Sequence, residues 1–348
     1  MGPVNNLAHA LWDQVEVRLN DRVVTGGQTG YSYKALMNTL LGETELNDSE
    51  LENSLFHKDT TGFMDDVSLA FGSNSGLKKR ASAMSGSRTV ELLGKVDVDV
   101  FKTNKYLLNG VTIDLNLTPT SNKFRLQSAN RETTDYKLEI VDITLILKHV
   151  TPSGLILLGH QDVMLKEISR AKYFYTKEEL RKFNLARDTS SYYIEDAFNG
   201  RVPSKIVLGF VSGESMGGSL TKNPYNFMHY DITFINVSLS GTPTPRGPLN
   251  LDFSEDKYLH CYSELYKGKP NYAYKARINR EEYRDGYTLF VIDLAPQNYD
   301  EFYPVTREGC VRIELRFKSP LKESVVMLTK VTYPGLFEID YARNLYLT

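Results

Sequence analysis

The sequence predicts a mainly all-β fold, in which two β-sandwich units carry short helical insertions. One observation behind this prediction is the strict alternation of apolar and charged residues, clearest in the stretch 311–317, VRIELRF. Another is composition, since 22 tyrosines and 16 phenylalanines suit the half-exposed faces of pleated sheets. The third is length, because 348 residues exceed one small domain and ~150 residues per domain indicate two units.

Charge, cysteine content and hydropathy exclude several classes of protein. The formal net charge is −2, so no basic surface predicts sequence-specific binding of nucleic acid. Cys261 and Cys310 are too few for a disulfide framework or a cysteine zinc site, and we expect two reduced core thiols. No apolar run approaches the ~20 residues of a membrane helix, and the first residues lack a signal peptide. A soluble chain made in the cytosol is therefore expected, without membrane insertion.

The N-terminal segment predicts a β-hairpin followed by a helix. Val15, Val17 and Leu19 alternate with charged residues, the pair Asn20-Asp21 offers a turn, and Gly26-Gly27 ends the returning strand. From residue 33 the apolar spacing changes to three and four, and Gly42 stands where a helix C-cap is expected.

A second short helix is expected at 47–55, and a long exposed loop after it. The stretch NDSE begins the helix, because asparagine at the N-cap followed by glutamate three residues later favours a capping box. Residues 57–88 are rich in Gly, Ser, Asp and Lys, which predicts an exposed loop. Within it, Lys78-Lys79-Arg80 is interpreted as part of a solvated loop, with nuclear import or phosphate contact as alternatives.

Further strands are predicted through the rest of the first half. In 96–100 and 111–117 apolar residues alternate with polar ones, so each strand has one wet face. Asp97, Asp99 and Asp114 are therefore expected to be solvated acids, although a calcium cluster is an alternative. Residues 136–150 and 156–165 are also expected to be strands, separated by a Thr-Pro-Ser-Gly turn.

A linker is expected at 171–200, with a short helix over 175–183 that begins with TKEE. The second half then returns to β. Strands are expected at 206–210, 232–234, 287–294, 311–317 and 325–332, with a helical insertion in DKYLHCYSELY, residues 256–266.

One stretch matches a catalytic motif literally. Residues 213–217 read GESMG, the G-x-S-x-G of a nucleophile elbow, directly after a predicted strand. The mechanism needs a following helix, but Pro224 comes too soon. A base and an acid for Ser215 would have to come from the following residues: His229, His260, Asp231 and Asp252. A glycine-rich turn is favoured over a catalytic serine, and no catalytic, cofactor-binding or metal-ligating residue is assigned.

Several blocks resemble one family when they are taken in order. They read PVNNLAHALWDQVEVRLNDRVV, YSYKALMNTLL, KYLLNGVTIDLNL, NPYNFMHYDITFINVSLSG, GYTLFVIDL and GCVRIELRFKSPL, with a final EIDYARN. This order resembles the double jelly-roll major capsid proteins of Polinton/Maverick-type (adintovirus-like) virus-like elements. The resemblance covers nearly the whole chain, and its specificity lies in the order, since no block is a catalytic motif. Relatives carry a further lead-in segment before the first block, which leaves open whether the first jelly roll lacks a strand.

The resemblance implies two jelly rolls, at 1–170 with the long loop 57–88 and at 201–348, joined by the linker 171–200. It implies a non-enzymatic capsid protein that assembles as a homotrimer, in pseudo-hexagonal capsomers of an icosahedral shell, without cofactors. Its partners would be copies of itself and a penton or minor capsid protein. It would be found in the virion after synthesis in the host cytoplasm, with assembly in the nucleus left open. The loop 57–88 is a candidate for tower or clamp contacts between chains.

Two other functions remain open. A β-sandwich module that binds carbohydrate would use exposed tyrosines between Tyr258 and Tyr274. Packing and interface roles are favoured for these tyrosines, because amphipathic Tyr is common in sheets and subunit contacts. A serine hydrolase acting through Ser215 is the other alternative.

Overall fold

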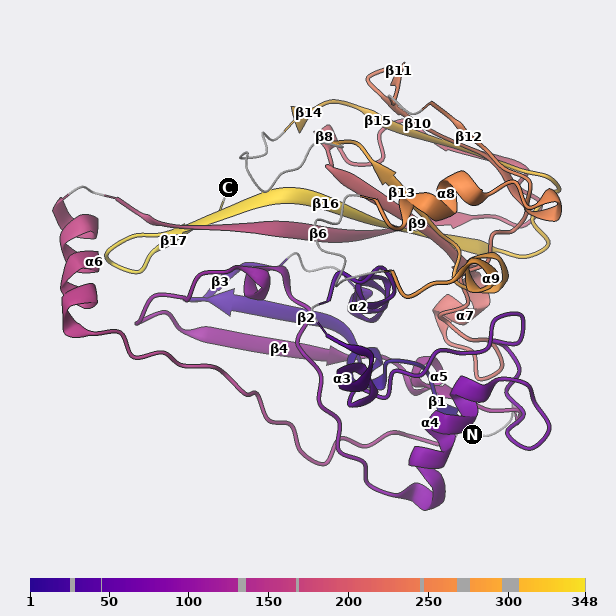
Figure 1. Ribbon diagram of the computed structural model, residues 1–348, viewed down its shortest axis with the longest axis horizontal. Helices are drawn as coiled ribbons and strands as arrows, with labels where there is room; N and C mark the ends of the chain where they lie inside the picture. The colour runs from indigo at the N-terminus through magenta and orange to yellow at the C-terminus, as the bar shows by residue number, and fades with distance from the viewer. Residues whose placement is uncertain are drawn as a thin grey trace.

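The computed structural model describes residues 1–25, 29–44, 46–130, 136–166, 169–244, 247–267, 276–295 and 307–347. Figure 1 shows a mainly β molecule with short helices, as the sequence predicts. The strands are β1 Gly2–Pro3, β2 Trp12–Leu19, β3 Arg22–Val23, β4 Ile113–Pro119, β5 Leu126–Gln127, β6 Ala171–Leu185, β7 Ser191–Ile194, β8 Arg201–Val202, β9 Lys205–Ser212, β10 Ile232–Leu239, β11 Thr242–Pro243, β12 Leu249–Asn250, β13 Leu289–Asp293, β14 Arg307–Glu308, β15 Val311–Phe317, β16 Val325–Ile339 and β17 Leu345–Leu347. The helical segments are α1 Leu7–Ala10, α2 Tyr31–Leu40, α3 Asp48–Glu52, α4 Ser75–Ala83, α5 Asn122–Arg125, α6 Gly154–Lys166, α7 Gly213–Gly217, α8 Leu259–Glu264 and α9 Arg280–Asp285, with short 3₁₀ turns at Ser85–Ser87 (η1), Asp99–Lys102 (η2) and Phe253–Glu255 (η3).

The C-terminal half folds as a jelly roll. One sheet places β6, β16, β9 and β13 side by side, and the other places β7, β15, β10 and β12 side by side. Along the chain the strands alternate between the two sheets, except that β10 and β12 share one, and the first strand β6 pairs with the last strand β16. Each sheet has one further short strand, β17 or β11, and the eight other strands connected in this way form a jelly roll. Their facing sides bury part of the larger core, including Phe210, Phe290 and Phe317.

The long ribbon formed by β6 and β16 joins this jelly roll to the N-terminal half (Figure 1). The two strands pair antiparallel over 15 residues, from Ala171 opposite Ile339 to Leu185 opposite Val325. One end of the ribbon belongs to the jelly roll, while Tyr173, Phe337 and Ile339 at the other end belong to a second, smaller core. At Gly335 a side chain would collide with the Tyr175 ring, since an added Cβ would lie 2.7 Å from it.

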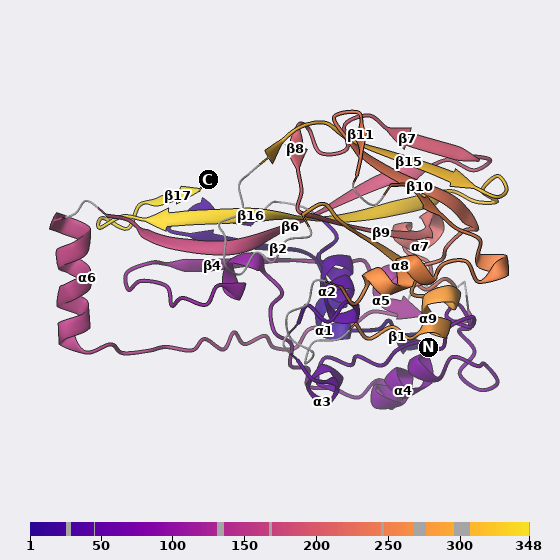
Figure 2. The same cartoon turned by 45° about the horizontal axis from the view of Figure 1, so that its top comes forward.

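The N-terminal half packs a small sheet and several helices under this ribbon, as the turned view of Figure 2 also shows. The sheet has the order β3-β2-β4 within the described residues. Its hairpin confirms the predicted one, and Asn20 and Asp21 adopt the positive φ angles of 46° and 62° that such a turn requires. The predicted Gly26-Gly27 strand end lies outside the described residues.

Most other predicted elements are confirmed. Helices α2 and α3 form where expected, Gly42 has a φ of 66°, and Asn47 and Glu50 make the predicted capping box. Strands β4, β9, β10, β13, β15 and β16 and helix α8 also form at the expected places.

The predicted linker helix at 175–183 is wrong, because these residues belong to β6. The TKEE start is a good helix cap on local grounds, but pairing with β16 along the whole segment overrides local propensity. The domain bounds 1–170, 171–200 and 201–348 stay a prediction, and β6 lies within the expected linker.

Three more local predictions are wrong. Residues 57–88 are not one exposed loop, since they contain α4, which buries Leu77 and Arg80. Residues 96–100 do not form a strand with a wet face but lead into the turn η2. Residues 136–150 are extended but pair with no described strand, and 156–165 lie in α6. The secondary structure of such segments depends on tertiary contacts, because hydrophobic periodicity does not show which strand or helix a segment packs against.

Candidate functional site

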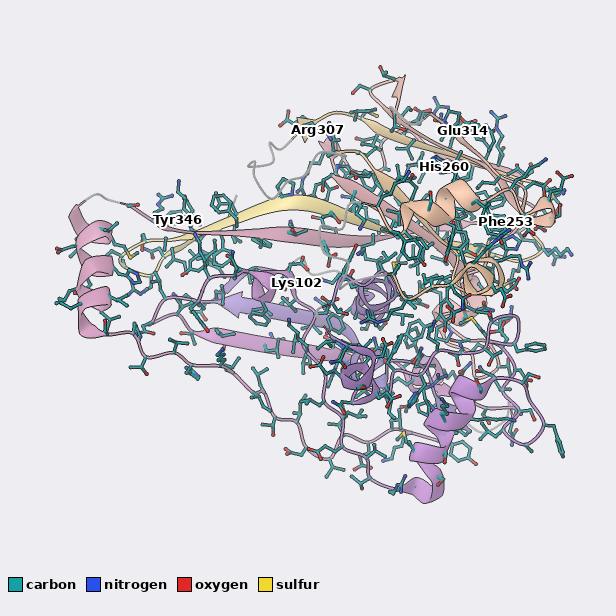
Figure 3. The ribbon with its side chains drawn as sticks, in the orientation of Figure 1. Lys102, Phe253, His260, Arg307, Glu314 and Tyr346 are labelled. Atoms are coloured by element: carbon teal, nitrogen blue, oxygen red, sulfur yellow. The ribbon has the colours of Figure 1, made fainter. Side chains whose placement is uncertain are left out.

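A group of mostly buried polar side chains lies where the N-terminal half meets the ribbon, and we name it the junction cluster. Its members come from α2, from the segments around Glu43 and η2, and from β6, β9 and β16. Figure 3 shows Lys102 between the ribbon and the β2–β4 sheet. The cluster consists of Lys34, Asn38, Glu43, Asp97, Asp99, Lys102, Glu178, Lys205 and Lys330.

Lys330 is fully buried, with no exposed side-chain surface. Its ammonium donates to the Asn38 amide oxygen, to Glu43 and to Glu178, the last at 3.1 Å. Glu43 also accepts from Lys205 of β9. An ammonium has three donors, so these three acceptors satisfy Lys330 completely.

The other half of the cluster holds the η2 segment against α2 and β6. Lys102 Nζ lies 2.6 Å from Asp97 Oδ1 and 3.0 Å from Glu178 Oε2. Lys34 Nζ donates to Asp99 Oδ1 at 2.7 Å, and the backbone N–H of Glu178 donates to Asp99 Oδ2 at 2.7 Å. The prediction of solvated acids at Asp97 and Asp99 is therefore wrong, since both are buried and paired.

The pKa values of these groups follow from burial and from their neighbours. Burial alone would raise the pKa of Glu178, but Lys330, Lys102 and Lys34 outweigh it and hold the pKa well below the ordinary range. In the same way Lys205 and Lys330 lower the pKa of Glu43 to about 2 against the effect of burial. Asp99 differs, because burial raises its pKa despite Lys34.

The junction cluster holds the N-terminal half against the ribbon through ion pairs. Its ammonium groups face carboxylates, and this pairing, against the effect of burial, keeps Glu43 and Glu178 charged at neutral pH. Within the described ranges, no group of three or more His, Cys, Asp or Glu side chains is arranged to hold a metal ion. Sequence reasoning missed this cluster, although Lys330 in the apolar run VVMLTKV was a signal, because a lysine inside a buried strand requires a partner.

A second buried ion pair contradicts the interpretation of Lys78-Lys79-Arg80 as a solvated patch. Arg80 Nη2 lies 2.6 Å from Asp59 Oδ1, and neither side chain has any exposed surface. Arg80 also donates to the carbonyl oxygens of Pro3 and His57, while Asn223 donates to Asp59 at 2.9 Å. Arg80 therefore fastens α4 to β1 and, through Asp59, to the C-terminal half.

Ser215 of the GESMG motif is not placed as a nucleophile. It lies in α7, five residues long, with only 1% of its surface exposed, and its Oγ donates to the Ser212 carbonyl oxygen at 2.8 Å. Of the candidate partners, His229 lies 3.3 Å from Asp231 and stacks on Phe253, while Asp252 accepts from Ser254. His260 pairs with Glu264 on α8. The structure brings none of them to the Ser215 hydroxyl within the described residues.

The tyrosines proposed for carbohydrate binding are engaged within the protein. Tyr258 is buried and stacks on Phe253 at a ring distance of 5.1 Å. Tyr262 and Tyr266 line a groove of about 1080 Å³ beside α3, but their rings meet edge to face and both hydroxyls bond to the Ile278 carbonyl oxygen. The remaining tyrosines up to Tyr274 lie outside the described residues.

The two cysteines differ, which corrects the expectation of two core thiols. Cys261 is buried and burial raises its pKa to about 12, whereas Cys310 is exposed. Among the described helices, none is long and apolar enough to cross a membrane.

Comparison with known proteins gives distant similarities. No protein-family model matches the sequence. A Caenorhabditis elegans protein described as uncharacterized protein F54H12.2 is 24% identical over 352 residues, covering 98% of this chain and 80% of the relative.

Several solved structures of capsid proteins are also similar to the chain. The mavirus major capsid protein has a TM-score of 0.45 at 10% identity, with 100% of this chain and 78% of that one covered. PBCV-1 VP54, fitted into a reconstruction of the virophage Sputnik, has a TM-score of 0.47 at 8% identity, covering 100% and 86%. The major capsid protein P2 of bacteriophage PM2 has a TM-score of 0.32 at 11% identity, covering 96% and 89%. Since every score is below 0.5, these similarities alone do not establish a function.

Proposed function

We propose that this chain is a viral or virus-like-element major capsid protein, a non-catalytic building block that assembles with copies of itself. The observation that carries the proposal is the jelly roll of the C-terminal half, whose β6–β16 ribbon extends into a second β unit. Jelly rolls occur in viral capsid and lectin domains. The ordered sequence blocks that resemble double jelly-roll capsid proteins favour the capsid.

The finer proposal is a homotrimer that forms pseudo-hexagonal capsomers of an icosahedral shell, in an element of the Polinton/Maverick type. The junction cluster supports a fixed building block, because its buried ion pairs hold the N-terminal half in one orientation on the ribbon. A penton or minor capsid protein would be a further partner, and the virion would be the place of action.

Light scattering after size exclusion tests the proposal on the purified full-length chain. A trimer would have a mass of about 118.5 kDa, three times the 39.5 kDa of one chain, and shells would be visible by electron microscopy. A monomer over a wide concentration range, without shells, would contradict the proposal and favour a β-sandwich binding module.

A further inference from the structure

The segment from Tyr136 to Leu165 carries an unusual concentration of exposed apolar side chains. Across the described residues, 27 large apolar side chains are exposed, and 14 of them fall in this 30-residue segment. Scattered apolar residues are normal on a surface, but a contiguous set marks a surface that binds a partner. We name residues 138–148 the free strand, and α6 follows it at the far end of the molecule (Figures 1 and 2).

The free strand has the pattern of a β-strand without the pairing. One face of an extended chain carries the apolar residues Val141, Ile143, Leu145 and Leu147, and the other face is mixed, with Leu138, Ile140 and Ile146 among Asp142, Thr144 and Lys148. Beyond the amide of Leu138, which donates to Asn122, no backbone hydrogen bond joins 139–150 to another described residue. An extended apolar segment with unpaired N–H and C=O groups is complementary to the edge of a sheet.

The same chain offers an incomplete sheet edge. Strand β4 pairs with β2 and is the last strand of its sheet among the described residues. Ile113, Leu115 and Leu117 of β4 are only partly buried against the smaller core. In that core 11 apolar side chains are partly buried beside 12 that are buried, whereas the larger core has 9 beside 51. One further apolar strand next to β4 would bury more of these partly exposed side chains.

We propose that the free strand pairs with the β4 edge of a second copy of this chain. The proposal rests on the capsid function proposed above and names its contact. In a single chain no backbone pairing joins the free strand to β4 among the described residues, and the apolar side chains of α6 are exposed. The free strand itself supplies 11 residues to this contact and the whole segment 136–165 has 30, against the ~20–30 residues that a stable interface takes from each side.

This contact is compatible with a ring. The donor is the free strand and the acceptor is the β4 edge, so the two surfaces of each chain differ. Such a head-to-tail contact closes into a ring when the rotation between chains permits it. A trimer in which each chain donates one strand and accepts one is therefore consistent with the proposed capsomer.

Single substitutions compare the apolar face that carries Ile143 with the mixed face that carries Thr144. Ile143→Asp places a carboxylate in the proposed contact, and we expect at least about a tenfold rise in the concentration at which the oligomer dissociates. Thr144→Asp adds the same charge on the other face and should leave it unchanged. Because Ile143 is 58% exposed in the single chain, its substitution should leave folding intact, and circular dichroism checks this.

Hydrogen exchange and cysteine cross-linking identify which segment pairs with the β4 edge. In a Cys310→Ser background, chains with Asn116→Cys in β4 are mixed with differently tagged chains that carry Asp142→Cys, Thr144→Cys or Ile146→Cys. A disulfide between the two differently tagged chains supports the proposal. Amides 139–148 should also be protected from hydrogen exchange only in the oligomer.

Three outcomes would overturn it, and they can be told apart. Assembly that is unaffected by Ile143→Asp, with amides 139–148 unprotected, would overturn this contact and leave the capsid function standing. Protected amides and a disulfide within one chain of a double-cysteine variant at high dilution would show that the free strand returns to its own β4. A wild-type chain that never assembles would contradict both proposals.

Discussion

The ammonium nitrogen of Lys330 lies 3.1 Å from Oε1 of Glu178, and both side chains are buried. The two residues belong to the paired strands β16 and β6, and through Asn38 and Lys102 they hold α2 and η2. A buried ion pair is costly to form, but removing one partner leaves an uncompensated charge in a water-poor site. The contact therefore makes the orientation of the N-terminal half on the ribbon sensitive to single substitutions.

Replacing Lys330 by methionine should destabilise the protein by about 3–5 kcal/mol, because Glu178 then remains buried with one fewer counter-charge. Urea unfolding measures the change. Lys322→Met is the matched control on an exposed lysine and should stay within about 0.5 kcal/mol of the wild type. A double variant, Lys330→Met with Glu178→Gln, should lose less than the sum of the two single variants. Strict additivity would contradict the pairing.

Acid should weaken the fold through the carboxylates of the junction cluster. Glu43, Asp97 and Glu178 have folded pKa values below their ordinary ones, so their stabilisation is present above about pH 4.5 and lost as pH falls towards 2. Asp99 has a raised pKa and partly offsets this loss. The unfolding free energy measured from pH 6 to pH 2 should fall less steeply in Glu43→Gln than in the wild type. Equal slopes would contradict the assignment.

The elements that were predicted correctly from the sequence are those whose turn or capping interactions come from neighbouring residues. The hairpin at 15–23 contains its own turn residues, and α3 contains both members of its capping box. Neighbouring residues are therefore sufficient to predict both elements. Strand β15 follows from alternation because its polar face is exposed.

The sequence failed where a distant partner decides the structure. Asp97 and Asp99 alternate with valines as in a half-exposed strand, yet lysines at 34 and 102 draw both carboxylates inside. Residues 175–183 read as a helix, yet β16, about 150 residues away, pairs with them. Ser215 matches the G-x-S-x-G motif in sequence only, since the motif does not require an exposed hydroxyl and the hydroxyl of Ser215 is buried.

Arg80→Met should destabilise the protein by about 3–5 kcal/mol, since it leaves Asp59 buried without its cation. Lys79→Met, one residue earlier and exposed, should change the unfolding free energy by no more than about 0.5 kcal/mol. Thermal and urea unfolding compare the two variants. If Arg80→Met is as stable as Lys79→Met, the buried anchor is not formed in solution.

A fluorophosphonate probe should not label Ser215. Its hydroxyl donates to the Ser212 carbonyl oxygen and is almost inaccessible, and no histidine contacts it among the described residues. Activation of a serine requires a base within hydrogen-bond reach. Intact-mass measurement after incubation should show no adduct on the wild type, while a serine hydrolase in a parallel sample confirms that the probe is active. Stoichiometric labelling that Ser215→Ala abolishes and Ser219→Ala retains would instead establish a nucleophile and restore the hydrolase alternative.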